Sequence, residues 1–359
     1  MSLTSVPPIE PSRIGEGRVL PNDLLSEQST LGGMLLSQEA IAEVYEYVKA
    51  DDFYAPKHET IFNAIMALYS KGEPTDVITV TDELTKNGEL VRAGAQVTIT
   101  ARNQEKAERT QKELSSQLIS TLQLDLADLN SVRKAAREFE GDLDVLILNA
   151  GVMAVPFTRT ADDFELQMGT NHLGHFAFAG LLSKRIKSRV VTISSQAHRT
   201  GSFGDGSVQT IRDICLGRNK YQPWGAYGAS KLANLLFTFE LERIANARGY
   251  GFNAFAAHPG YSNTNLQSVG PQMRGSLREE RATAFMNSII AQSAAKGALP
   301  TLCAATFPNL YGASYIGPDG FMEMRGYPKA TRARSIAYDQ SLARNLWSVS
   351  EELTGVQWH

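Results

Sequence analysis

The feature that most constrains the fold of this chain is an alternation of short apolar runs and helical segments that begins near Gly94. The runs are rich in β-branched residues, as expected for strands buried on both faces of a parallel sheet. They lie at residues 95–100, 119–124, 145–148, 190–193 and 252–257. Strands that alternate with helices favour an α/β fold with a doubly wound, Rossmann-like parallel sheet.

The chain before this alternation has a purely helical pattern. Apolar residues recur at helical spacing from Asp23 to Ser70, and Ser37 is expected to cap a helix. Residues 1–22 are rich in Pro, Ser and Gly without periodicity, which favours a disordered tail. We therefore predict a tail at 1–22, a small all-α domain at 23–91 and an α/β domain at 92–359.

The composition and charge of the chain limit the kinds of binding partner that we expect. A net charge of -3 gives no electrostatic case for binding nucleic acid or an anionic membrane. Cys215 and Cys303 fit neither a disulfide framework nor a metal cluster, so we expect no metal site. We find no apolar run of the roughly 18 residues that span a membrane and no signal-peptide core. These features predict a cytoplasmic protein without direct nucleic-acid or membrane contact.

Tyr227 and Lys231 stand four residues apart in a segment of helical pattern, so their side chains share one face. A phenol has a pKa of about 10 and exchanges protons poorly at neutral pH. An ammonium one turn away is expected to favour the phenolate and to lower that pKa. Ser194 and Ser195 follow the predicted strand at 190–193, where a hydroxyl could bond a substrate carbonyl oxygen. This set indicates proton exchange at an alcohol or carbonyl oxygen.

Ordered motifs connect these residues to a known family. They are T-A-R-N, L-D-L-A-D, L-I-L-N-A-G, T-N-H-L-G-H-F, V-T-I-S-S, Y-G-A-S-K-L-A-N and H-P-G-Y-S-N-T. From about Ala93 to its end, the chain resembles the short-chain dehydrogenase/reductase family, especially its retinol-dehydrogenase-like members. The resemblance implies an NAD(P)-dependent oxidoreductase that interconverts a small-molecule alcohol and a carbonyl compound. The long gap between Ser195 and Tyr227 fits that branch, which inserts a loop there.

The resemblance also implies catalytic roles. Tyr227 would be the acid/base, and Lys231 would activate it and bond the nicotinamide ribose. Ser195 would polarise the carbonyl, and Asn171 would hold a water relay behind the lysine. The helices that carry Asn171 and Tyr227 commonly pack against a second subunit in this family, so we expect a homo-oligomer.

Cofactor contacts follow from the same motifs. Arg102, directly after a predicted strand, would favour a 2′-phosphate and hence NADP, although NAD stays possible. The remaining expected contacts are Asp125 and Leu126 at the adenine, Asn149, Ala150 and Gly151 along the adenosine, and Pro259, Gly260 and Thr264, with Tyr227 and Lys231, at the nicotinamide side.

A second resemblance covers residues from about 20 to 90. The segments L-P-N-D-L-L-S-E-Q-S-T-L-G-G-M-L-L-S, D-D-F-Y-A-P-K-H-E-T-I-F-N-A-I and G-E-P-T-D-V-I-T-V-T-D-E-L are similar to the N-terminal domain of the replicative DNA helicase DnaB. That domain serves ring assembly and primase contact, so it implies a protein contact of that kind. The sequence has no G-x-x-x-x-G-K-[ST] loop, which excludes the helicase motor.

One defining part of the dehydrogenase family is missing. Its members open with a strand, a T-G-x-x-x-G-x-G turn and a helix, and the turn brings backbone N–H groups to the cofactor pyrophosphate. This motif is absent from the sequence, and the two resemblances meet at residues 90–95, so the chain resembles a chimera of two truncated parts. The missing strand would lie at the centre of the sheet, and its loss leaves two strand edges unpaired.

Two outcomes are open for the centre of the sheet. The β-branched residues 77–81 could replace the missing strand, with 82–91 as its helix, although Asn87-Gly88 favours helix termination. Alternatively, these residues keep a helicase-like fold and the sheet has a gap. Even a replacement would bring Thr81 and Asp82 to the place of the glycines, where the carboxylate repels a pyrophosphate.

Two functions therefore compete. One is an NADP-preferring oxidoreductase, and the other is a fusion in which a helicase-type head joins a dehydrogenase part that cannot bind cofactor. The substrate is not defined beyond a small or lipophilic carbonyl compound. Residues 262–283 are a candidate lid, Trp224, Met153 and Tyr261 are candidates for lining the substrate pocket, and His258 is expected to be structural.

Overall fold

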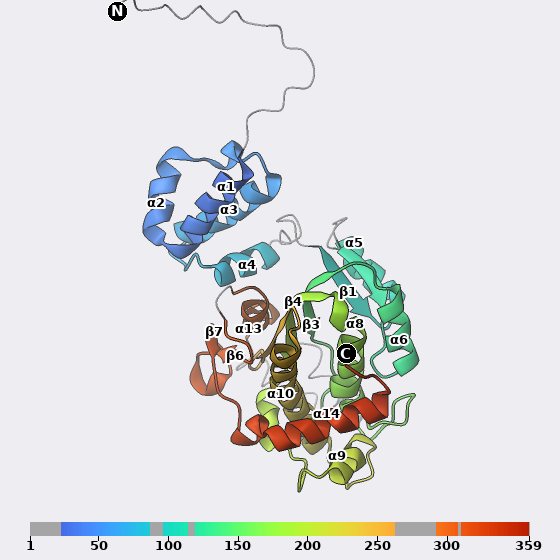
Figure 1. Cartoon of the computed structure of the whole chain (residues 1–359). Coiled ribbons are helices and arrows are strands. Elements are labelled where there is room, and N and C mark those ends of the chain that lie inside the picture. The colour runs from blue at the N-terminus through green and yellow to red at the C-terminus, as the bar shows by residue number, and fades with distance from the viewer. Residues whose placement is uncertain (1–22, 87–95, 114–118, 263–291, 308–309, 359) are drawn as a thin grey trace, which may run out of the picture.

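The protein is described by a computed structural model over residues 23–86, 96–113, 119–262, 292–307 and 310–358. The predicted tail at 1–22, Thr264 and the candidate lid beyond Ser262 lie outside these residues. Both predicted folded parts are present, an all-α domain followed by an α/β domain (Figure 1).

The all-α domain contains α1 (Leu24–Leu36), α2 (Gln38–Tyr47), α3 (Pro56–Ser70) and α4 (Val77–Lys86). Ser37 caps α2 as predicted, since its hydroxyl accepts a hydrogen bond from the Ala40 N–H. The Glu27 carboxylate fixes the turn before α3 by accepting from the Tyr54 N–H at 2.7 Å and from His58 Nδ1 at 2.6 Å. The core of the domain consists of Leu31, Met34, Ile41, Phe53, Phe62, Ala64, Ile65, Leu68, Val80 and Leu84.

The α/β domain alternates strands and helices as the sequence predicts. Its strands are β1 (Val97–Ala101), β2 (Ile119–Gln123), β3 (Leu143–Leu148), β4 (Ile186–Ile193), β5 (Asn253–Ala257), β6 (Tyr315–Pro318) and β7 (Pro328–Ala330). Its α-helices are α5 (Gln104–Glu113), α6 (Leu129–Glu138), α7 (Leu166–Met168), α8 (Gly174–Leu182), α9 (Val208–Cys215), α10 (Pro223–Arg248), α13 (Ala294–Thr306) and α14 (Gln340–Thr354). Short 3₁₀ turns include η4 (Gln196–Thr200) and η5 (Phe321–Glu323).

The sheet is divided into two parts. β1 and β2 form a parallel pair, and the other strands form a sheet in the order β3-β4-β5-β6-β7, parallel except for β7. Within the described residues, β1 pairs with β2 alone and β3 pairs with β4 alone. Among the described residues, one edge of β1 and one edge of β3 therefore have no strand partner, and we call this interruption the sheet break.

The hypothesis that residues 77–81 fill the centre of the sheet is wrong. They form the first half of α4, and the Val80 N–H donates to the Asp76 carbonyl within that helix at 3.0 Å. The Asp76 side chain caps the helix by accepting from the Thr79 N–H at 3.0 Å. Val80 and Leu84, one turn apart, are buried in the all-α core. This cap and this burial outweigh the β propensity of the segment.

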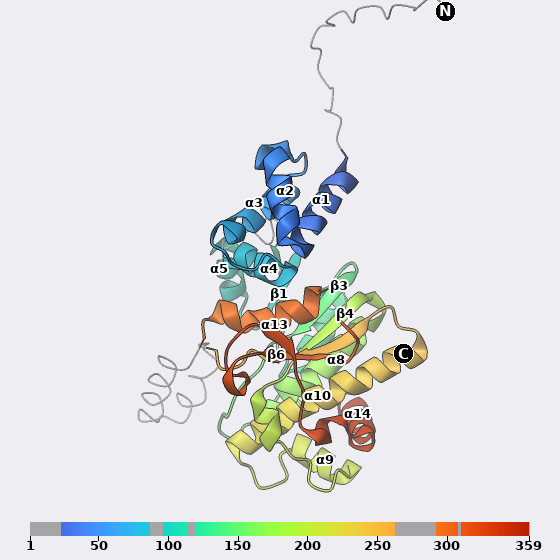
Figure 2. The ribbon, with the colours of Figure 1, turned by 90° about the vertical axis from the view of Figure 1, so that its left-hand side faces the viewer.

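The helicase-like α4 lies against the dehydrogenase-like α13, which covers one face of the five-stranded sheet (Figures 1 and 2). Cys303 and Ala304 of α13 pack on Val191 of β4 and Phe255 of β5. The opposite face is covered by α8 and α10, and α14 lies outside them (Figure 2). The α/β domain thus keeps the layered arrangement of a doubly wound fold.

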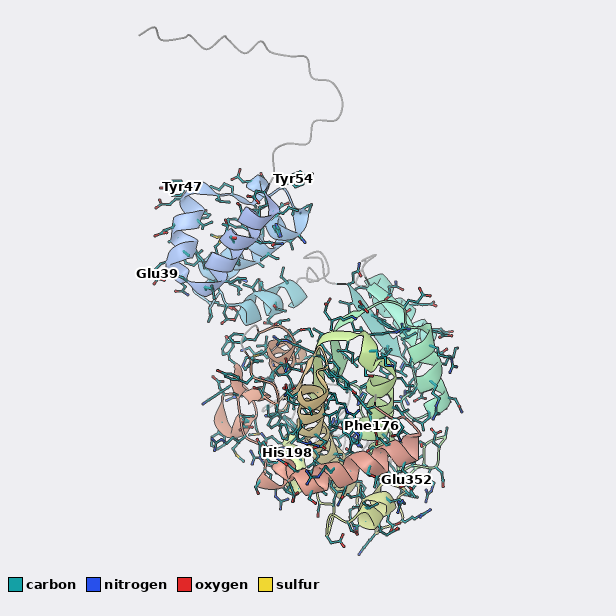
Figure 3. The ribbon with its side chains drawn as sticks, in the orientation of Figure 1. Glu39, Tyr47, Tyr54, Phe176, His198 and Glu352 are labelled. Atoms are coloured by element: carbon teal, nitrogen blue, oxygen red, sulfur yellow. The ribbon has the colours of Figure 1, made fainter. Side chains whose placement is uncertain are left out.

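An aromatic cluster joins α8, α10 and α14. Phe176 of α8, labelled in Figure 3, lies 5.0 Å from Trp347 of α14 between ring centroids. Phe237 of α10 stacks on the same indole at 5.8 Å. Trp358 packs against all three rings. The C-terminal helix of the same chain therefore covers part of the surface of α8 and α10. The expected homo-oligomer, which would use these helices, stays a prediction. None of the helices within the described ranges combines the length and the apolarity needed to cross a membrane.

Candidate active site

Pro223 is the first residue of α10, and Tyr227 lies in the second turn of this helix. Only 4 % of its surface is exposed, and burial raises the pKa of the phenol to about 12, while a hydrogen bond with Ser195 opposes that rise. Ser195 follows β4, and its Oγ also accepts from the Ala197 N–H at 3.2 Å as the cap of η4. The structure therefore brings together the predicted acid/base and the predicted carbonyl-binding hydroxyl.

Lys231 is buried one turn further along α10. Its Nζ donates to the Ile193 carbonyl at 3.0 Å and lies 5.8 Å from the Tyr227 ring centroid. Burial lowers the pKa of the ammonium to about 8. In this structure burial dominates the pKa of Tyr227, and the Lys231 ammonium is directed at a backbone carbonyl, so the expected lowering of that pKa by Lys231 stays a prediction.

Asn171 occupies a π-helical turn, Gly169–Leu173, directly before α8. Such turns carry one extra residue and are frequent at functional sites. The side-chain amide donates to the Val152 carbonyl and to Ser230 Oγ, both at 2.9 Å, and its Oδ1 accepts from the Val152 N–H at 2.8 Å. The side chain is thus held in one orientation beside the loop after β3.

Gly151 is the point where this loop meets the predicted catalytic residues. A Cβ atom there would lie 3.0 Å from Asn171 Oδ1 and 3.7 Å from Lys231 Nζ. Three predicted residues from three separate elements therefore converge. Ser230, which bonds Asn171, was not predicted; its position beside Lys231 in the sequence was the one available signal.

The predicted cofactor residues lie where strands end. Arg102 follows β1 and is exposed, and the Asp125 carboxylate after β2 accepts from the Ala127 N–H at 2.9 Å. Leu126 is buried against Gly174 of α8. Asn149 and Ala150, after β3, are exposed.

The residues predicted for the nicotinamide side lie in the turn after β5. Gly260 has a φ of +66°, and a Cβ atom there would lie 2.4 Å from the Met324 carbonyl, so this position requires glycine. The Tyr261 N–H donates to the same carbonyl at 2.7 Å. Trp224, 58 % exposed, meets the Tyr227 ring edge-to-face at 6.1 Å, and Met153 is half-buried.

The described residues supply only part of what a dinucleotide needs. Lys231 provides a buried cation beside Gly151, at the end predicted for the nicotinamide. The pyrophosphate needs consecutive N–H groups at a helix N-terminus between β1 and β3. The part of the chain that the structure describes provides no strand, glycine turn and helix at the sheet break.

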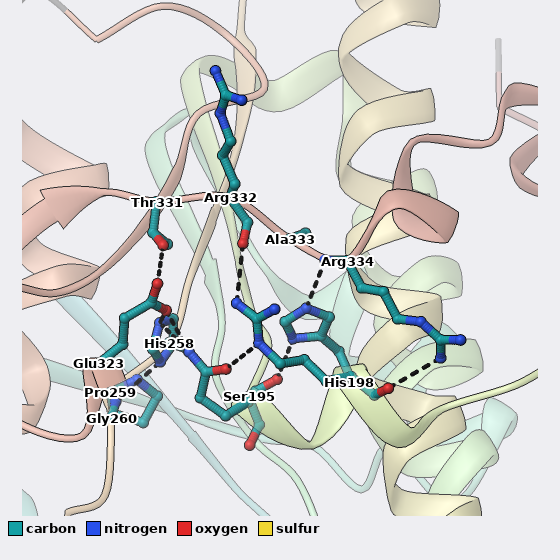
Figure 4. Close-up of polar contacts among 12 residues, drawn as sticks. Ser195, His198, His258, Pro259, Gly260, Glu323, Thr331, Arg332, Ala333 and Arg334 are labelled. Atoms are coloured by element: carbon teal, nitrogen blue, oxygen red, sulfur yellow. Dashed lines mark hydrogen bonds and ion pairs between the residues drawn. The ribbon is translucent and has the colours of Figure 1, made fainter. Parts of the chain in front are cut away.

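A polar network that the sequence analysis missed ties the site together (Figure 4). The Glu323 carboxylate lies 3.0 Å from His258 Nε2 and accepts hydrogen bonds from Gln196 Nε2 and Thr331 Oγ1. These bonds, that of His258 first, lower the pKa of Glu323 to about 2. Gln196 follows Ser195, and His258 precedes the Pro259–Gly260 turn. Glu323 therefore connects both turns of the site and keeps His258 in the structural role expected for it.

Comparisons with known proteins identify the family of this chain. The model of the short chain dehydrogenase family matches residues 87–207, and human Retinol dehydrogenase 11 is 34% identical over 300 residues, covering 79% of this chain and 87% of that protein. The chain belongs to the short-chain dehydrogenase family. The crystal structure of an uncharacterized protein from Mycobacterium Paratuberculosis is 40% identical, with a TM-score of 0.62, and the match covers 77% of this chain and 90% of that one.

The N-terminal part is similar to a second family. The model of the DnaB-like helicase N terminal domain matches residues 19–110. The N-terminal domain of DnaB helicase from Mycobacterium tuberculosis is 52% identical over 21% of this chain and 52% of that one, with a TM-score of 0.21. The short-chain dehydrogenase therefore carries a helicase-type head, and the predicted chimera is confirmed.

Proposed function

We propose that this chain is an alcohol/carbonyl oxidoreductase whose acid/base is Tyr227. The observation that carries the proposal is the position of Ser195 at the end of β4 beside the buried Tyr227, where the serine hydroxyl opposes the effect of burial on the pKa of the phenol. Two hydroxyls at one place can both bond the oxygen of a carbonyl substrate. The bonds of Lys231 to the Ile193 carbonyl and of Asn171 to Ser230 Oγ support a role for both residues in the same site.

The residues of this chain can supply the proton that a carbonyl reduction needs. In the family, the hydride belongs to the nicotinamide cofactor, and the protein controls the substrate oxygen. A phenol with a pKa of about 12 stays protonated at neutral pH, so Tyr227 is ready to donate. Ser195 holds the carbonyl oxygen while the phenol proton moves to it, and the neutral alcohol forms.

Arg102 supports NADP as the preferred cofactor. Its guanidinium is exposed at the carboxyl end of β1, where a neighbouring acid would favour NAD and a cation favours a 2′-phosphate. The Trp224 ring beside Tyr227 supports a lipophilic substrate, because an exposed indole offers a flat apolar surface at the site.

A second candidate function has its own supporting observation. The sheet break leaves no phosphate-binding turn within the described residues, which supports a fusion that has kept its catalytic side chains without binding cofactor. In that case the helicase-type head is the working part, and its partner is a protein of the helicase or primase kind. Homo-oligomerisation and a cytoplasmic location remain predictions under both functions.

The test is a titration of the purified chain with NADPH and NADH, followed by nicotinamide fluorescence. We expect NADPH to bind more tightly than NADH, and Arg102→Ala to reduce that preference about tenfold, since a charge-assisted bond contributes about 1.5–3 kcal/mol. Arg109→Ala, an exposed arginine on α5, should leave the preference unchanged. If a folded protein binds neither nucleotide, the cofactor-free fusion is the correct reading.

A further inference from the structure

His198 is a fully buried histidine to which the proposed function gives no role. It lies in η4, shortly after Ser195, and its side chain is closed off from solvent. Burial lowers the pKa of the imidazole to about 4, so the ring is neutral at pH 7. A neutral imidazole has one N–H donor and one acceptor nitrogen, so its two nitrogens need partners of opposite kinds.

The two partners of His198 define which ring nitrogen carries the proton (Figure 4). The backbone N–H of Arg334 lies 3.2 Å from Nε2 and can only donate, so Nε2 is the acceptor. The Ser195 carbonyl lies 2.7 Å from Nδ1 and can only accept, so Nδ1 carries the proton. Both contacts require the same tautomer, and the other tautomer would satisfy neither of them.

Ser195 follows the sheet directly and is held from η4. The Ser194 N–H donates to the Ala257 carbonyl of β5 at 2.8 Å, so the sheet bonds reach the preceding residue. The Ser195 carbonyl accepts from the backbone N–H of His198 at 3.0 Å and from Nδ1 of the same residue. The Ser195 Oγ accepts from the Ala197 N–H at 3.2 Å. Both oxygens of Ser195 therefore depend on the same short turn.

Arg334 connects His198 to α10, the helix that carries the proposed acid/base. The residue before it, Ala333, donates its backbone N–H to the Tyr338 hydroxyl at 3.0 Å. The Tyr338 ring stacks on Phe239 of α10 with 4.8 Å between centroids. The N–H group that meets Nε2 is therefore fixed relative to α10.

The geometry points to His198 as a positioning residue for the substrate-binding hydroxyl: its Nδ1–H holds the Ser195 carbonyl, and the Arg334 main chain keeps the ring in the tautomer and place that this bond requires. The inference rests on the proposed function, in which Ser195 binds the substrate oxygen beside Tyr227. A misplacement of about 1 Å at a reacting group can lower a rate about a hundredfold. His198 acts through Ser195 and exchanges no proton with the substrate.

A rival account is that Gln196 fixes the turn by itself. Its side chain donates to the Glu323 carboxylate, and its Oε1 accepts from Arg199 Nε at 2.7 Å. These contacts hold a side chain, whereas His198 holds the main-chain carbonyl of Ser195 (Figure 4). The two accounts differ in what should follow when His198 loses its donor to that carbonyl.

Two substitutions remove one contact of His198 each. The amide nitrogen of Asn reaches the place of Nδ1, so His198→Asn keeps the donor to Ser195 and loses the acceptor for Arg334. The amide oxygen of Gln reaches the place of Nε2, so His198→Gln keeps the acceptor and loses the donor. Each variant leaves one buried bond unmade, so we expect similar losses of stability. His198→Gln alone should release Ser195.

Hydrogen exchange at the Ala197 amide measures the position of Ser195, because this N–H bonds Ser195 Oγ. We expect exchange at least about tenfold faster in His198→Gln and within about threefold of the unchanged chain in His198→Asn. His58→Gln, which removes a bond of a buried histidine in the all-α domain, should leave this amide unchanged.

Two exchange results would overturn the inference. Unchanged exchange in His198→Gln would mean that the contacts of Gln196 hold the turn. Equal acceleration in His198→Gln and His198→Asn would mean that a general loss of stability moves Ser195.

Nitrogen-15 NMR of the full chain at pH 7 tests the tautomer without any reaction. The ring signals of His198 are those that both variants at this position lack. We expect a proton on Nδ1 and none on Nε2, because the Arg334 N–H occupies the side of Nε2. A proton on Nε2, or on both nitrogens, would contradict the role of His198.

Turnover of NADPH with decanal separates this inference from the proposed function. We expect His198→Gln to lower kcat about tenfold or more with the KM for NADPH within about twofold, because Ser195 acts on the substrate oxygen. His198→Asn should keep kcat within about threefold. Faster Ala197 exchange with an unchanged kcat would contradict positioning for the reaction. If the unchanged chain binds no NADPH, the oxidoreductase is wrong, and the tautomer and the Ala197 exchange still decide whether His198 holds Ser195.

Discussion

At the scale of single residues, Lys231 shows what the candidate active site demands of the fold. Its ammonium is buried and bonds the Ile193 carbonyl, which also accepts from Asn234 Nδ2 at 2.9 Å. Burial disfavours the charged form and lowers the pKa from its usual value to about 8. The cation is therefore held at the expense of stability, as is common at functional sites.

Replacing this lysine should stabilise the protein at neutral pH. The folded-state pKa lies below the unfolded one, so the penalty is complete below pH 8 and disappears as the pH rises towards 10.5. Lys231→Met should raise the free energy of unfolding by about 2–3 kcal/mol at pH 7 and by much less at pH 10. Urea titrations at both pH values measure this, with the exposed Lys184→Met as control. A loss of stability at pH 7 would contradict the assignment.

The Glu323 carboxylate is expected to stabilise the protein at neutral pH and to lose this effect in acid. Its neighbour Met322 and Glu323 itself have φ values of 52° and 56°, a conformation that side chains disfavour and that the carboxylate contacts hold. Because its pKa is lowered to about 2, the stabilisation is complete above pH 4.5 and is lost as the pH falls towards 2.

Glu323→Gln should therefore destabilise the protein at pH 7, and the difference from the unchanged chain should shrink between pH 4.5 and 2.5. Faster hydrogen exchange at Gln196 and Gly260 should accompany it, because both turns lose their common anchor. Glu138→Gln, at a half-exposed surface position on α6, is the matched control. A difference that does not depend on pH would show that the carboxylate charge has no part in holding the turns.

At the scale of elements, the sequence pattern predicted those strands and helices whose structure depends mainly on neighbouring residues. The strands at 119–124, 145–148, 190–193 and 252–257 appear within a few residues of their predicted bounds, because apolar, β-branched runs bury well in a parallel sheet. Residues 77–81 have the same composition and form a helix instead, since Val80 and Leu84 fit the all-α core. Glu323 was missed because its partners come from turns far away in the sequence, which no periodicity connects.

Two glycines in helices allow the effect of close packing on stability to be measured separately from the effect of helix propensity. A Cβ atom at Gly174, at the start of α8, would lie 2.3 Å from the Leu126 carbonyl, so the helix would have to move from the end of β2. A Cβ atom at Gly225, in the first turn of α10, would meet Gln222 Cβ at an ordinary 3.5 Å. Gly174→Ala should destabilise by about 1–3 kcal/mol, whereas Gly225→Ala should stabilise by up to about 1 kcal/mol. Thermal unfolding checks the two signs, and equal shifts would contradict the close approach.

At the scale of the whole molecule, the sheet break divides the α/β domain into parts of unequal stability. β4 and β5 pair with each other over five residues and are covered on both faces, whereas β1 has alternating half-buried and exposed residues. The β1–β2 pair is held by its helices and by contacts around Leu126. A central strand that pairs on both sides normally makes such a sheet one cooperative unit. Because no described strand joins the β1–β2 pair to the five-stranded sheet, we expect this pair to unfold first.

Hydrogen exchange in increasing urea measures this order. Amides of β1 and β2 should lose protection at a lower urea concentration than those of β4 and β5, and the unfolding curve should deviate from two-state behaviour. Ile99→Ala in β1 should move the first transition alone, while Val191→Ala in β4 should move the second. Coincident loss of protection in all four strands would contradict the separation. It would mean that contacts through α6 and α8 transmit stability across the break as well as a strand would.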